Sequence, residues 1–256
     1  MNTGPGLPTV EVPGGRVEYD DVPGGPALAP LLFLHEGLGS VGLWRGFHRR
    51  VAAATGRRAV AYSRLGHGFS DLPPRKRTAR FAHEEAETVV PALVAALGLE
   101  RPVLVGHSDG ASIALLHAAA ADVTGLVVLA PHVLVEEHGL AGIRQARRTF
   151  AEGDLRRRMA RHHCDPDVTF RHWNDVWLSV EFRDWDLRPA LPGIRCPTLA
   201  VQGTADEYGT AVHVEEVRTR AGGPVEVLML DCGHAPHLER PDDVEAAVTA
   251  FLRGLP

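Results

Sequence analysis

The sequence predicts an α/β fold in which helices cover both faces of a mostly parallel central sheet. Two observations predict it. Short, continuously apolar segments recur along the chain, and helix-length segments of mixed polarity separate them, although one long stretch interrupts this alternation. Strands buried on both faces have such apolar sequences, and alternating strands and helices are typical of right-handed crossover units in a parallel sheet.

The expected elements follow this pattern from the amino terminus onward. The segments 9–12 (TVEV) and 16–22 (RVEYDDV) alternate apolar and polar residues around a Pro-Gly-Gly turn, which indicates a hairpin at one end of the sheet. Buried strands are expected at 30–35, 58–63, 102–107, 125–130, 197–202 and 225–230. Helices are expected at 41–54, 80–97, 109–121, 210–221 and 241–253.

The interruption covers residues 132–190. This stretch has charged helical patterns and three tryptophans, Trp173, Trp177 and Trp185, but no convincing buried strand. An insertion of about 60 residues between two parallel strands is longer than an ordinary loop, and such insertions are usually functional. We therefore expect residues 1–131 and 191–256 to form one core, with 132–190 as an inserted helical cap, or lid, over the carboxyl edge of the sheet.

The composition excludes several other classes of protein. With 45% hydrophobic and 23% charged residues, the 256-residue chain is close to an average globular protein rather than a disordered or collagen-like one. The net charge of −5 is spread without long blocks of one sign, which does not favour a nucleic-acid partner. Three widely spaced cysteines, Cys164, Cys196 and Cys232, argue against a disulfide framework and for a reducing compartment.

Targeting signals are not visible in the sequence. The first residues, MNTGPGLPTVEVPGG, contain no apolar stretch behind basic residues, so we expect no signal peptide. No apolar run approaches the roughly 20 residues of a membrane-spanning helix. We expect a soluble, cytoplasmic protein with a small-molecule substrate and no membrane partner. The sequence gives no indication of the oligomeric state.

One sequence motif indicates a nucleophilic serine. The strand at 102–107 leads into Gly106-His107-Ser108-Asp109-Gly110 and then directly into a helical segment. This is the G-x-S-x-G pattern, in which a strained strand-to-helix turn exposes the serine hydroxyl at the carboxyl edge of the sheet. A serine needs a base, and the base needs an orienting group. Asp206 and His234 each follow a later strand, so the three side chains can meet at one sheet edge in the order Ser, Asp, His.

These residues give the chain a family resemblance. Together with HEGLGS (35–40), SRLGHGFSD (63–71), TADEYG (204–209) and GHAPHLERP (233–241), the motif resembles the α/β-hydrolase superfamily over nearly the whole chain, and its serine esterases and lactonases in particular. The resemblance implies an α/β-hydrolase fold. It also implies that Ser108 is the nucleophile, that His234 is the general base and then the acid, and that Asp206 orients His234.

The same resemblance implies an oxyanion hole made of two backbone N–H groups. One belongs to Asp109, directly after the nucleophile. The other belongs to the loop 35–40, where alignment on His35 favours Gly37, with Glu36 as the alternative.

Some side chains near this site have two interpretations. Glu36 either contacts substrate or is turned to solvent or paired with an arginine, as charged loop residues usually are. Asp109 either binds a substrate ammonium group, as in hydrolases of α-amino esters that share the Ser-Asp-Gly arrangement, or caps the following helix. Trp173 and Trp177 either contact substrate or form a small core within the insertion.

Other candidates for these roles are weaker. Asp71 precedes the nucleophile in a loop that relatives use structurally, and Asp231 is too near His234 in sequence to face it. Two groups, Cys232/His234/His237 and His162-His163-Cys164-Asp165, suggest a metal site, but neither has the second ligand pair of a zinc site. We therefore expect no metal and no cofactor. Among the fourteen histidines, only His234 is expected to carry chemistry.

The predicted activity is hydrolysis of a carboxylic ester or lactone of a small molecule through an acyl-enzyme. Thioester hydrolysis and carbon–carbon bond hydrolysis are alternatives on the same triad, because this fold supports many reactions. Relatives that act on epoxides or halides use an aspartate at the position of Ser108. A ligand-binding protein without turnover is a further alternative, although such proteins usually lose a member of the triad, and here all three are present.

Overall fold

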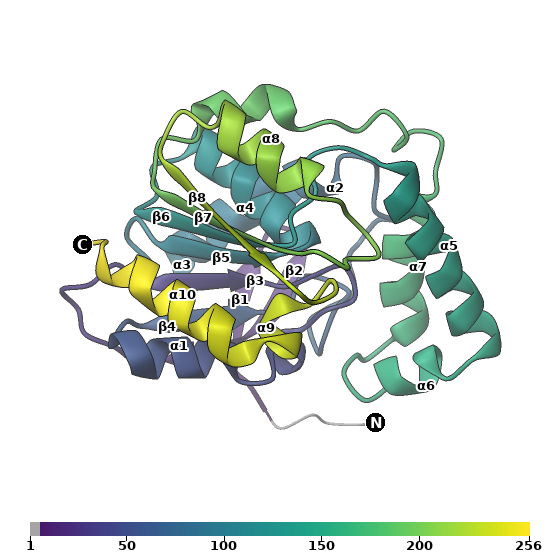
Figure 1. Cartoon of the computed structure of the whole chain (residues 1–256). Coiled ribbons are helices and arrows are strands. Elements are labelled where there is room, and N and C mark those ends of the chain that lie inside the picture. Colours follow the sequence, from purple (N-terminus) through teal and green to yellow (C-terminus); the bar gives the residue numbers. More distant parts are fainter. Residues whose placement is uncertain (1–5) are drawn as a thin grey trace.

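Eight strands form one sheet in the order β1-β2-β4-β3-β5-β6-β7-β8. The computed structural model describes residues 6–256, and Figure 1 shows the arrangement. The strands are β1 (Thr9–Val12), β2 (Gly15–Val22), β3 (Leu31–Leu34), β4 (Ala59–Tyr62), β5 (Val103–His107), β6 (Gly125–Leu129), β7 (Thr198–Gly203) and β8 (Val225–Leu230). Strand β2 is antiparallel to β1 and β4, and the six strands β3 to β8 run parallel to one another. The predicted α/β fold with a mostly parallel sheet is confirmed.

The sheet topology determines where loops can meet. Strand β3 lies between β4 and β5, with Leu34 opposite both Tyr62 and Gly106. The loops that follow these three strands therefore leave the sheet at the same edge. The chain order reverses beside β3, and in open α/β sheets such a switch point is where ligands bind.

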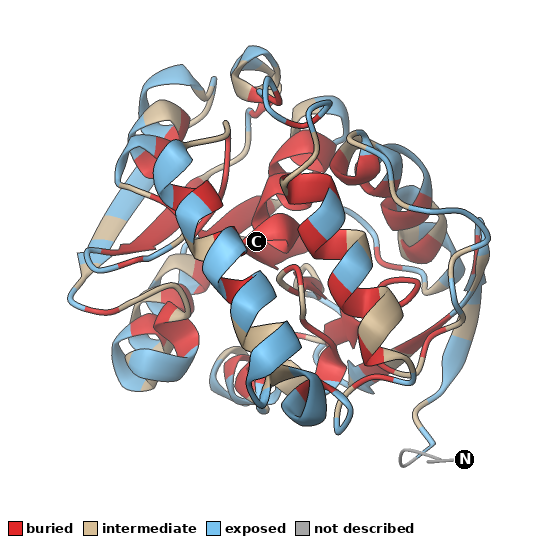
Figure 2. Cartoon of the chain, turned by 90° about the vertical axis from the view of Figure 1, so that its right-hand side faces the viewer, coloured by how far each residue is buried: buried red, intermediate tan, exposed pale blue. Residues whose placement is uncertain are grey.

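Apolar strands explain why helices cover both faces. Every residue of β3, β4, β5 and β6 is buried. One face packs against α1 (Phe47–Thr55) and α10 (Pro241–Arg253), and the other against α3 (Val90–Ala96), α4 (Asp109–Ala120) and α8 (Val212–Arg220). Figure 2 shows the buried residues gathered in the sheet and on the inner sides of the helices, with exposed residues on their outer sides.

Two expected helices differ in detail from the prediction. The segment expected at 41–54 contains a 3-10 turn, η1 (Val41–Trp44), separated from α1 by Arg45 and Gly46, whose φ angles of 48° and 77° interrupt a helix. The segment expected at 80–97 contains α2 (Phe81–Glu84), a π turn, η2 (Glu85–Val89), and α3. Pro91 at the start of α3 has no N–H to continue the α-helical ladder, which accounts for a shift in the hydrogen bonding there.

The stretch between β6 and β7 is helical. It contains α5 (Glu137–Glu152), α6 (Leu155–Met159) and α7 (Pro166–Trp177), followed by the 3-10 segment η3 (Arg188–Gly193). Asp165 caps α7 by accepting hydrogen bonds from the N–H groups of Asp167 and Val168. Helices α5 and α7 pack through the stacked rings of Phe150 and Phe170, whose centroids are 3.8 Å apart. In Figure 1 these helices lie together at one side of the sheet.

The remaining elements complete the path of the chain. A short helix, α9 (Pro236–Glu239), connects the loop after β8 to α10. Within residues 6–256, no helix has the length and apolar character needed to span a membrane. The expectation about a signal peptide rests partly on residues 1–5, which lie outside the described residues.

Candidate active site

Ser108 lies in the tight turn between β5 and α4. Its φ of 53° is unusual for a residue with a side chain, and its N–H donates a hydrogen bond of 2.9 Å to the carbonyl of Leu129. The turn requires glycine on both sides. A Cβ at Gly106 would lie 2.5 Å from the Cα of Ala111, and a Cβ at Gly110 would lie 2.0 Å from the carbonyl oxygen of Leu34.

The structure brings the three residues of the expected triad together. The Oγ of Ser108 lies 2.8 Å from Nε2 of His234, and Nδ1 of His234 lies 2.8 and 2.9 Å from the two carboxylate oxygens of Asp206. In the neutral ring, Nδ1 donates its proton to Asp206. Nε2 is then free to accept the proton of the serine hydroxyl, which is the arrangement that a serine nucleophile requires.

The carboxylate of Asp206 is held by further donors. Its Oδ1 accepts hydrogen bonds from the N–H groups of Tyr208 (2.8 Å) and Gly209 (3.2 Å), and its Oδ2 accepts one from Nε2 of Gln202 (2.7 Å). Burial alone would raise the pKa of Asp206, but the hydrogen bond and charge of His234 and the N–H of Tyr208 outweigh it and lower the pKa to about 2.

Sequence reasoning missed Gln202. The residue is fully buried at the end of β7 and contacts the expected triad acid directly. The sequence does contain an indication of this contact. A glutamine near the end of an otherwise apolar strand needs a hydrogen-bond partner when it is buried. Its position immediately before the loop of Asp206 suggests that partner.

The loop 35–40 is fixed by buried donors. Arg64 is fully buried and donates from Nη1 to the carbonyl of His35 (2.6 Å) and from Nη2 to that of Glu36 (2.9 Å). Burial and the charge of Arg64 hold the pKa of His35 well below its usual value. The neutral ring donates from Nδ1 to the carbonyl of Glu36 and accepts at Nε2 from the N–H of Arg64. His67 Nε2 lies 3.0 Å from the carbonyl of Gly37 and holds the next peptide.

A cavity of about 190 Å³ opens onto Ser108 and His234. The indole of Trp173 packs on Gly37, where an added Cβ would lie 2.2 Å from Cδ1 of the ring. Residues of the core and of the stretch between β6 and β7 line the cavity together: Glu36, Gly37, Leu38, Ser108, His132, Ile143, Trp173, Trp177, Tyr208 and His234. The cavity thus contains three of the four residues predicted to contact substrate, together with His132 and with Tyr208, which the sequence did not single out for this role.

Glu36 differs from the expectation of a carboxylate turned to solvent or paired with an arginine. Its side chain is 28% exposed and lines the cavity, and its closest charge partner is Nδ1 of His107 at 3.6 Å.

Asp109 is the one residue predicted to contact substrate that does not line the cavity. It is 1% exposed, and its Oδ1 accepts a hydrogen bond of 3.1 Å from Nε1 of Trp177. No residue in the range 6–256 donates to its Oδ2. Because Oδ1 bonds Trp177 and Oδ2 has no donor in the described residues, the side chain does not cap α4. Burial raises the pKa of this carboxyl, against the opposing charges of Arg64 and Arg77.

The weaker candidates lie elsewhere. Asp71 accepts hydrogen bonds from the N–H (3.0 Å) and Nε (3.3 Å) of Arg16, and Asp231 is exposed. Of the suspected metal ligands, His163 instead contacts the N–H of Gly68 and the carbonyl of Leu38. Within the described part of the chain, no three histidine, cysteine or acidic side chains gather in a way that could hold a metal ion.

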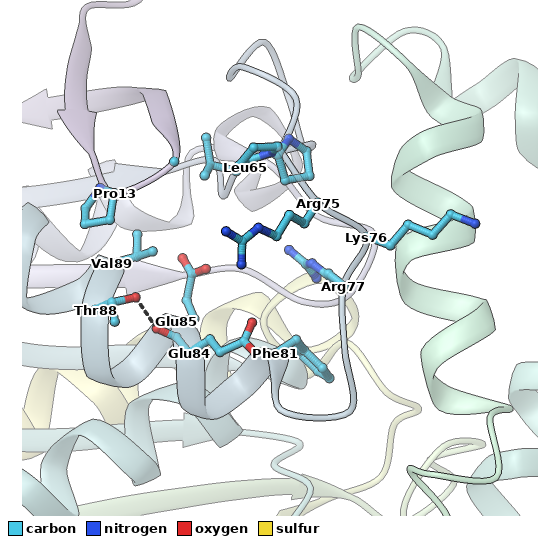
Figure 3. A pocket seen from close by; sticks show the side chains of 13 residues that line it. Pro13, Leu65, Arg75, Lys76, Arg77, Phe81, Glu84, Glu85, Thr88 and Val89 are labelled. Atoms are coloured by element: carbon cyan, nitrogen blue, oxygen red, sulfur yellow. Dashed lines mark hydrogen bonds between the residues drawn. The ribbon is translucent and has the colours of Figure 1, made fainter.

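A second and more open cavity, of about 280 Å³, lies away from the triad. Figure 3 shows Arg75 and Arg77 on one side of it and Glu84 and Glu85 on the other, with Phe81 at one end. None of the triad residues lines this cavity. Its basic and acidic side chains oppose one another, and among its described lining residues no nucleophile is paired with a base.

Comparison with curated proteins gives a relative that matches the whole chain. The chain is 27% identical over 271 aligned residues to the dihydrolipoyllysine-residue acetyltransferase component of the acetoin cleaving system of Pseudomonas putida, an alignment that covers 98% of this chain and 70% of that protein. Two further relatives match over 82 residues each, and those matches span 4% and 26% of their lengths.

Comparison with solved structures gives relatives of full length. The enol-lactonase from Burkholderia xenovorans LB400 superposes with a TM-score of 0.75 at 19% identity, covering 96% of this chain and 100% of that one. Est816, described as an N-acyl homoserine lactone degrading enzyme, superposes with a TM-score of 0.72 at 26% identity, covering 95% and 100%. Residues 31–247, most of the chain, match the family described as "Alpha/beta hydrolase family". The chain belongs to the alpha/beta hydrolase family.

Proposed function

We propose that this protein is a serine hydrolase that cleaves a carboxylic ester or lactone of a small molecule. The observation that carries the proposal is the continuous chain of contacts from Ser108 Oγ through His234 to Asp206, at the floor of a cavity large enough for a small substrate. The full-length similarity to an enol-lactonase and to an N-acyl homoserine lactone degrading enzyme supports the same class of reaction.

The proposed reaction has two steps. His234 Nε2 takes the proton of Ser108 as Oγ attacks the carbonyl carbon, and the resulting tetrahedral intermediate expels the alcohol, which receives that proton from His234. The acyl group then remains on Ser108. Water, deprotonated by His234, attacks the acyl-enzyme, and the acid is released as Oγ regains its proton. For a lactone, the alcohol and the acid belong to one product.

The charge that develops on the carbonyl oxygen needs donors. We assign this role to the N–H of Asp109, at the first position of α4 where N–H groups have no partner within the helix, and to the N–H of Gly37, with that of Glu36 as the alternative. Each such donor typically contributes a factor of about 10²–10³ in rate.

We further propose that residues 132–190 act as the cap of the site. His132, Ile143, Trp173 and Trp177 from this stretch line the cavity opposite the loop 35–40. Their side chains exclude water from the acyl-enzyme and select substrates by shape. Thioester or carbon–carbon bond hydrolysis would use the same residues, and no contact in the cavity favours either over ester hydrolysis.

A comparison of wild type with Ser108→Ala tests the proposal. The wild-type protein should hydrolyse p-nitrophenyl acetate or butyrate, and a fluorophosphonate should label it at Ser108, as located by peptide mass spectrometry. Ser108→Ala should lose both activities while retaining the far-UV circular dichroism of the wild type. A variant that keeps the wild-type rate would contradict the serine mechanism. A wild type that binds esters without turnover or labelling would indicate a ligand-binding protein.

A further inference from the structure

Within the described residues, no side chain donates a hydrogen bond to the carboxylate of Glu36. Within residues 6–256, the groups that donate to Glu36 bond its main-chain carbonyl, and none reaches the carboxylate oxygens. The side chain is 28% exposed, and it lines the cavity that contains Ser108. A carboxylate that faces a cavity without a charged partner in hydrogen-bond range can pair with a cation that enters the cavity.

The neighbouring histidine does not satisfy this carboxylate. His107 Nδ1 lies 3.6 Å from Oε2 of Glu36, which is too long for a hydrogen bond. The other ring nitrogen, Nε2, lies 2.8 Å from the carbonyl oxygen of His234 and must carry a proton to donate to it. A neutral His107 ring therefore presents an unprotonated Nδ1 to Glu36, and that nitrogen has no other partner in the described chain.

The walls of the same cavity are aromatic. Trp173, Trp177 and Tyr208 all line it, and the rings of Trp173 and Tyr208 meet edge to face with centroids 6.4 Å apart. The faces of indole and phenol rings attract cations. No lysine or arginine is among the residues that line the cavity, so nothing basic in its walls competes for Glu36.

Glu36 also affects the proposed reaction directly. It belongs to the loop that we assign to the oxyanion hole, where a negative charge opposes the charge that develops on the carbonyl oxygen. A neutral substrate leaves this opposition in place. A substrate with a cationic group next to Glu36 removes it, so that recognition of the cation and stabilisation of the transition state are coupled.

We infer that the cavity selects esters or lactones that carry an ammonium group, which the Glu36 carboxylate pairs with and the indole faces of Trp173 and Trp177 surround. This inference rests on the proposed serine hydrolase function. It identifies the substrate class of that site, and it assigns recognition of the ammonium to Glu36 rather than to Asp109, whose side chain is turned to Trp177.

Two pairs of substrates of matched shape test the inference. Acetylcholine and 3,3-dimethylbutyl acetate differ by the charge in the alcohol, and N,N,N-trimethylglycine ethyl ester and ethyl 3,3-dimethylbutanoate differ by the charge in the acyl group. Each kcat/KM is divided by the hydroxide-catalysed rate of the same ester, which removes differences in intrinsic reactivity. We expect the wild type to prefer the cation by about tenfold or more in at least one pair, as expected for a desolvated cation on aromatic rings.

The variant Glu36→Gln should abolish this preference in a characteristic way. Its kcat/KM should fall for the cationic ester and rise for the neutral one, because the charge that attracts the first also opposes the reaction of the second. Glu152→Gln makes the same change of charge on the exposed surface of α5 and should keep the wild-type preference. Equal corrected values within both pairs for the wild type, or an unchanged preference in Glu36→Gln, would overturn the inference.

Isothermal titration calorimetry of the wild-type protein measures the affinity of the cavity for a cation without any substitution. Choline should bind about tenfold or more tightly than 3,3-dimethylbutan-1-ol, which has the same shape without the charge. Similar affinities overturn the cation site. If choline binds selectively but Ser108 neither reacts with a fluorophosphonate nor turns over any ester, the proposed hydrolase function fails while the cation site stands.

Discussion

Trp177 at the end of α7 donates a hydrogen bond of 3.1 Å from Nε1 to Oδ1 of Asp109, the residue that follows Ser108 in the chain. Both side chains are buried, at 4% and 1% exposed. The contact joins two segments that are 68 residues apart and connects the stretch between β6 and β7 to the turn that holds the nucleophile. The position of a cavity wall is therefore coupled to the position of the expected nucleophile.

The first prediction concerns the stability of this contact. Trp177→Phe keeps most of the ring but removes the N–H, and leaves a buried carboxyl without a donor. We expect the free energy of unfolding in urea to fall by about 1–3 kcal/mol, the usual cost of an unsatisfied buried group. Trp185→Phe is the matched control, because its buried Nε1 has no partner among residues 6–256.

A second substitution shows whether Asp109 is the cause. In an Asp109→Leu background, the Nε1 of Trp177 has no acceptor at that position, and the effect of Trp177→Phe should shrink markedly. Equal losses in the wild-type and Asp109→Leu backgrounds would show that Trp177 stabilises the fold through packing alone.

The second prediction concerns the loop 35–40. In Gly37→Ala, the added methyl group would lie 2.2 Å from Cδ1 of Trp173, so either the loop or the indole must move. Displacement of the N–H assigned to the oxyanion hole should lower kcat/KM for an ester by about 10²–10³. In Gly42→Ala the nearest atom would be 3.8 Å away, and this variant should keep the wild-type rate. Full activity of Gly37→Ala would show that this N–H does not bind the oxyanion.

The sequence was sufficient to predict the strands of the sheet, but the expectation that 225–230 is buried was wrong, because β8 is an edge strand with exposed residues. Strands β3 to β7 are largely apolar and buried throughout because both of their faces are covered, and their apolar character is local to each segment. The juxtaposition of Ser108, Asp206 and His234 was predictable for a related reason. Each residue directly follows a parallel strand, and parallel strands present their carboxyl ends at one edge.

The contacts between side chains were not predictable in the same way. Glu36 and His107 approach each other because β3 and β5 are neighbours in the sheet, and no local pattern encodes that pair. The hydrogen bond from Trp177 to Asp109 depends on how α7 packs on the core, which periodicity does not determine. The break at Arg45 was missed because a left-handed backbone at an arginine is set by tertiary contacts rather than by propensity.

The third prediction concerns Gln202, which we regard as a positioning residue for Asp206. Gln202→Met fills a similar volume but removes the donor that lies 2.7 Å from Oδ2. A hydrogen bond to a charged group is worth about 1.5–3 kcal/mol, so kcat should fall by roughly ten- to a hundredfold if that bond orients the carboxylate. KM should stay close to the wild-type value, because Gln202 does not line the cavity.

A fall in kcat with an unchanged KM indicates that Gln202 positions Asp206, whereas a general loss of structure would affect both constants. Thr249→Val is a suitable control, since it also alters a buried polar group, in α10, whose hydroxyl has no partner within the described residues. It should leave both constants unchanged. If Gln202→Met raises KM while kcat is preserved, the glutamine shapes the binding cavity rather than the triad.

The last prediction concerns Glu136, which joins the start of the stretch between β6 and β7 to the loop of Asp206. Its carboxylate accepts hydrogen bonds from the N–H (3.0 Å) and Oγ1 (2.8 Å) of Thr210, and it lies 2.8 Å from Nε2 of His213. The close contact with His213, together with the hydrogen bonds from Thr210, outweighs partial burial and lowers the pKa of Glu136 from 4.5 to about 2.

A depressed pKa means that the ionised carboxylate stabilises the folded state. This stabilisation is fully present above pH 4.5, the unfolded value, and is lost as the pH falls towards 2. Glu136→Gln should therefore lower the free energy of unfolding by about 1–3 kcal/mol at neutral pH, and the difference from wild type should shrink as urea titrations move below pH 4.5. Glu137→Gln, at the adjacent exposed position, should change stability little at any pH, because its ion pair with Arg144 lies in solvent. A loss in Glu136→Gln that stays constant down to acid pH would mean that the side chain stabilises the fold by packing, because a contribution from its charge has to disappear when the wild-type carboxylate is protonated.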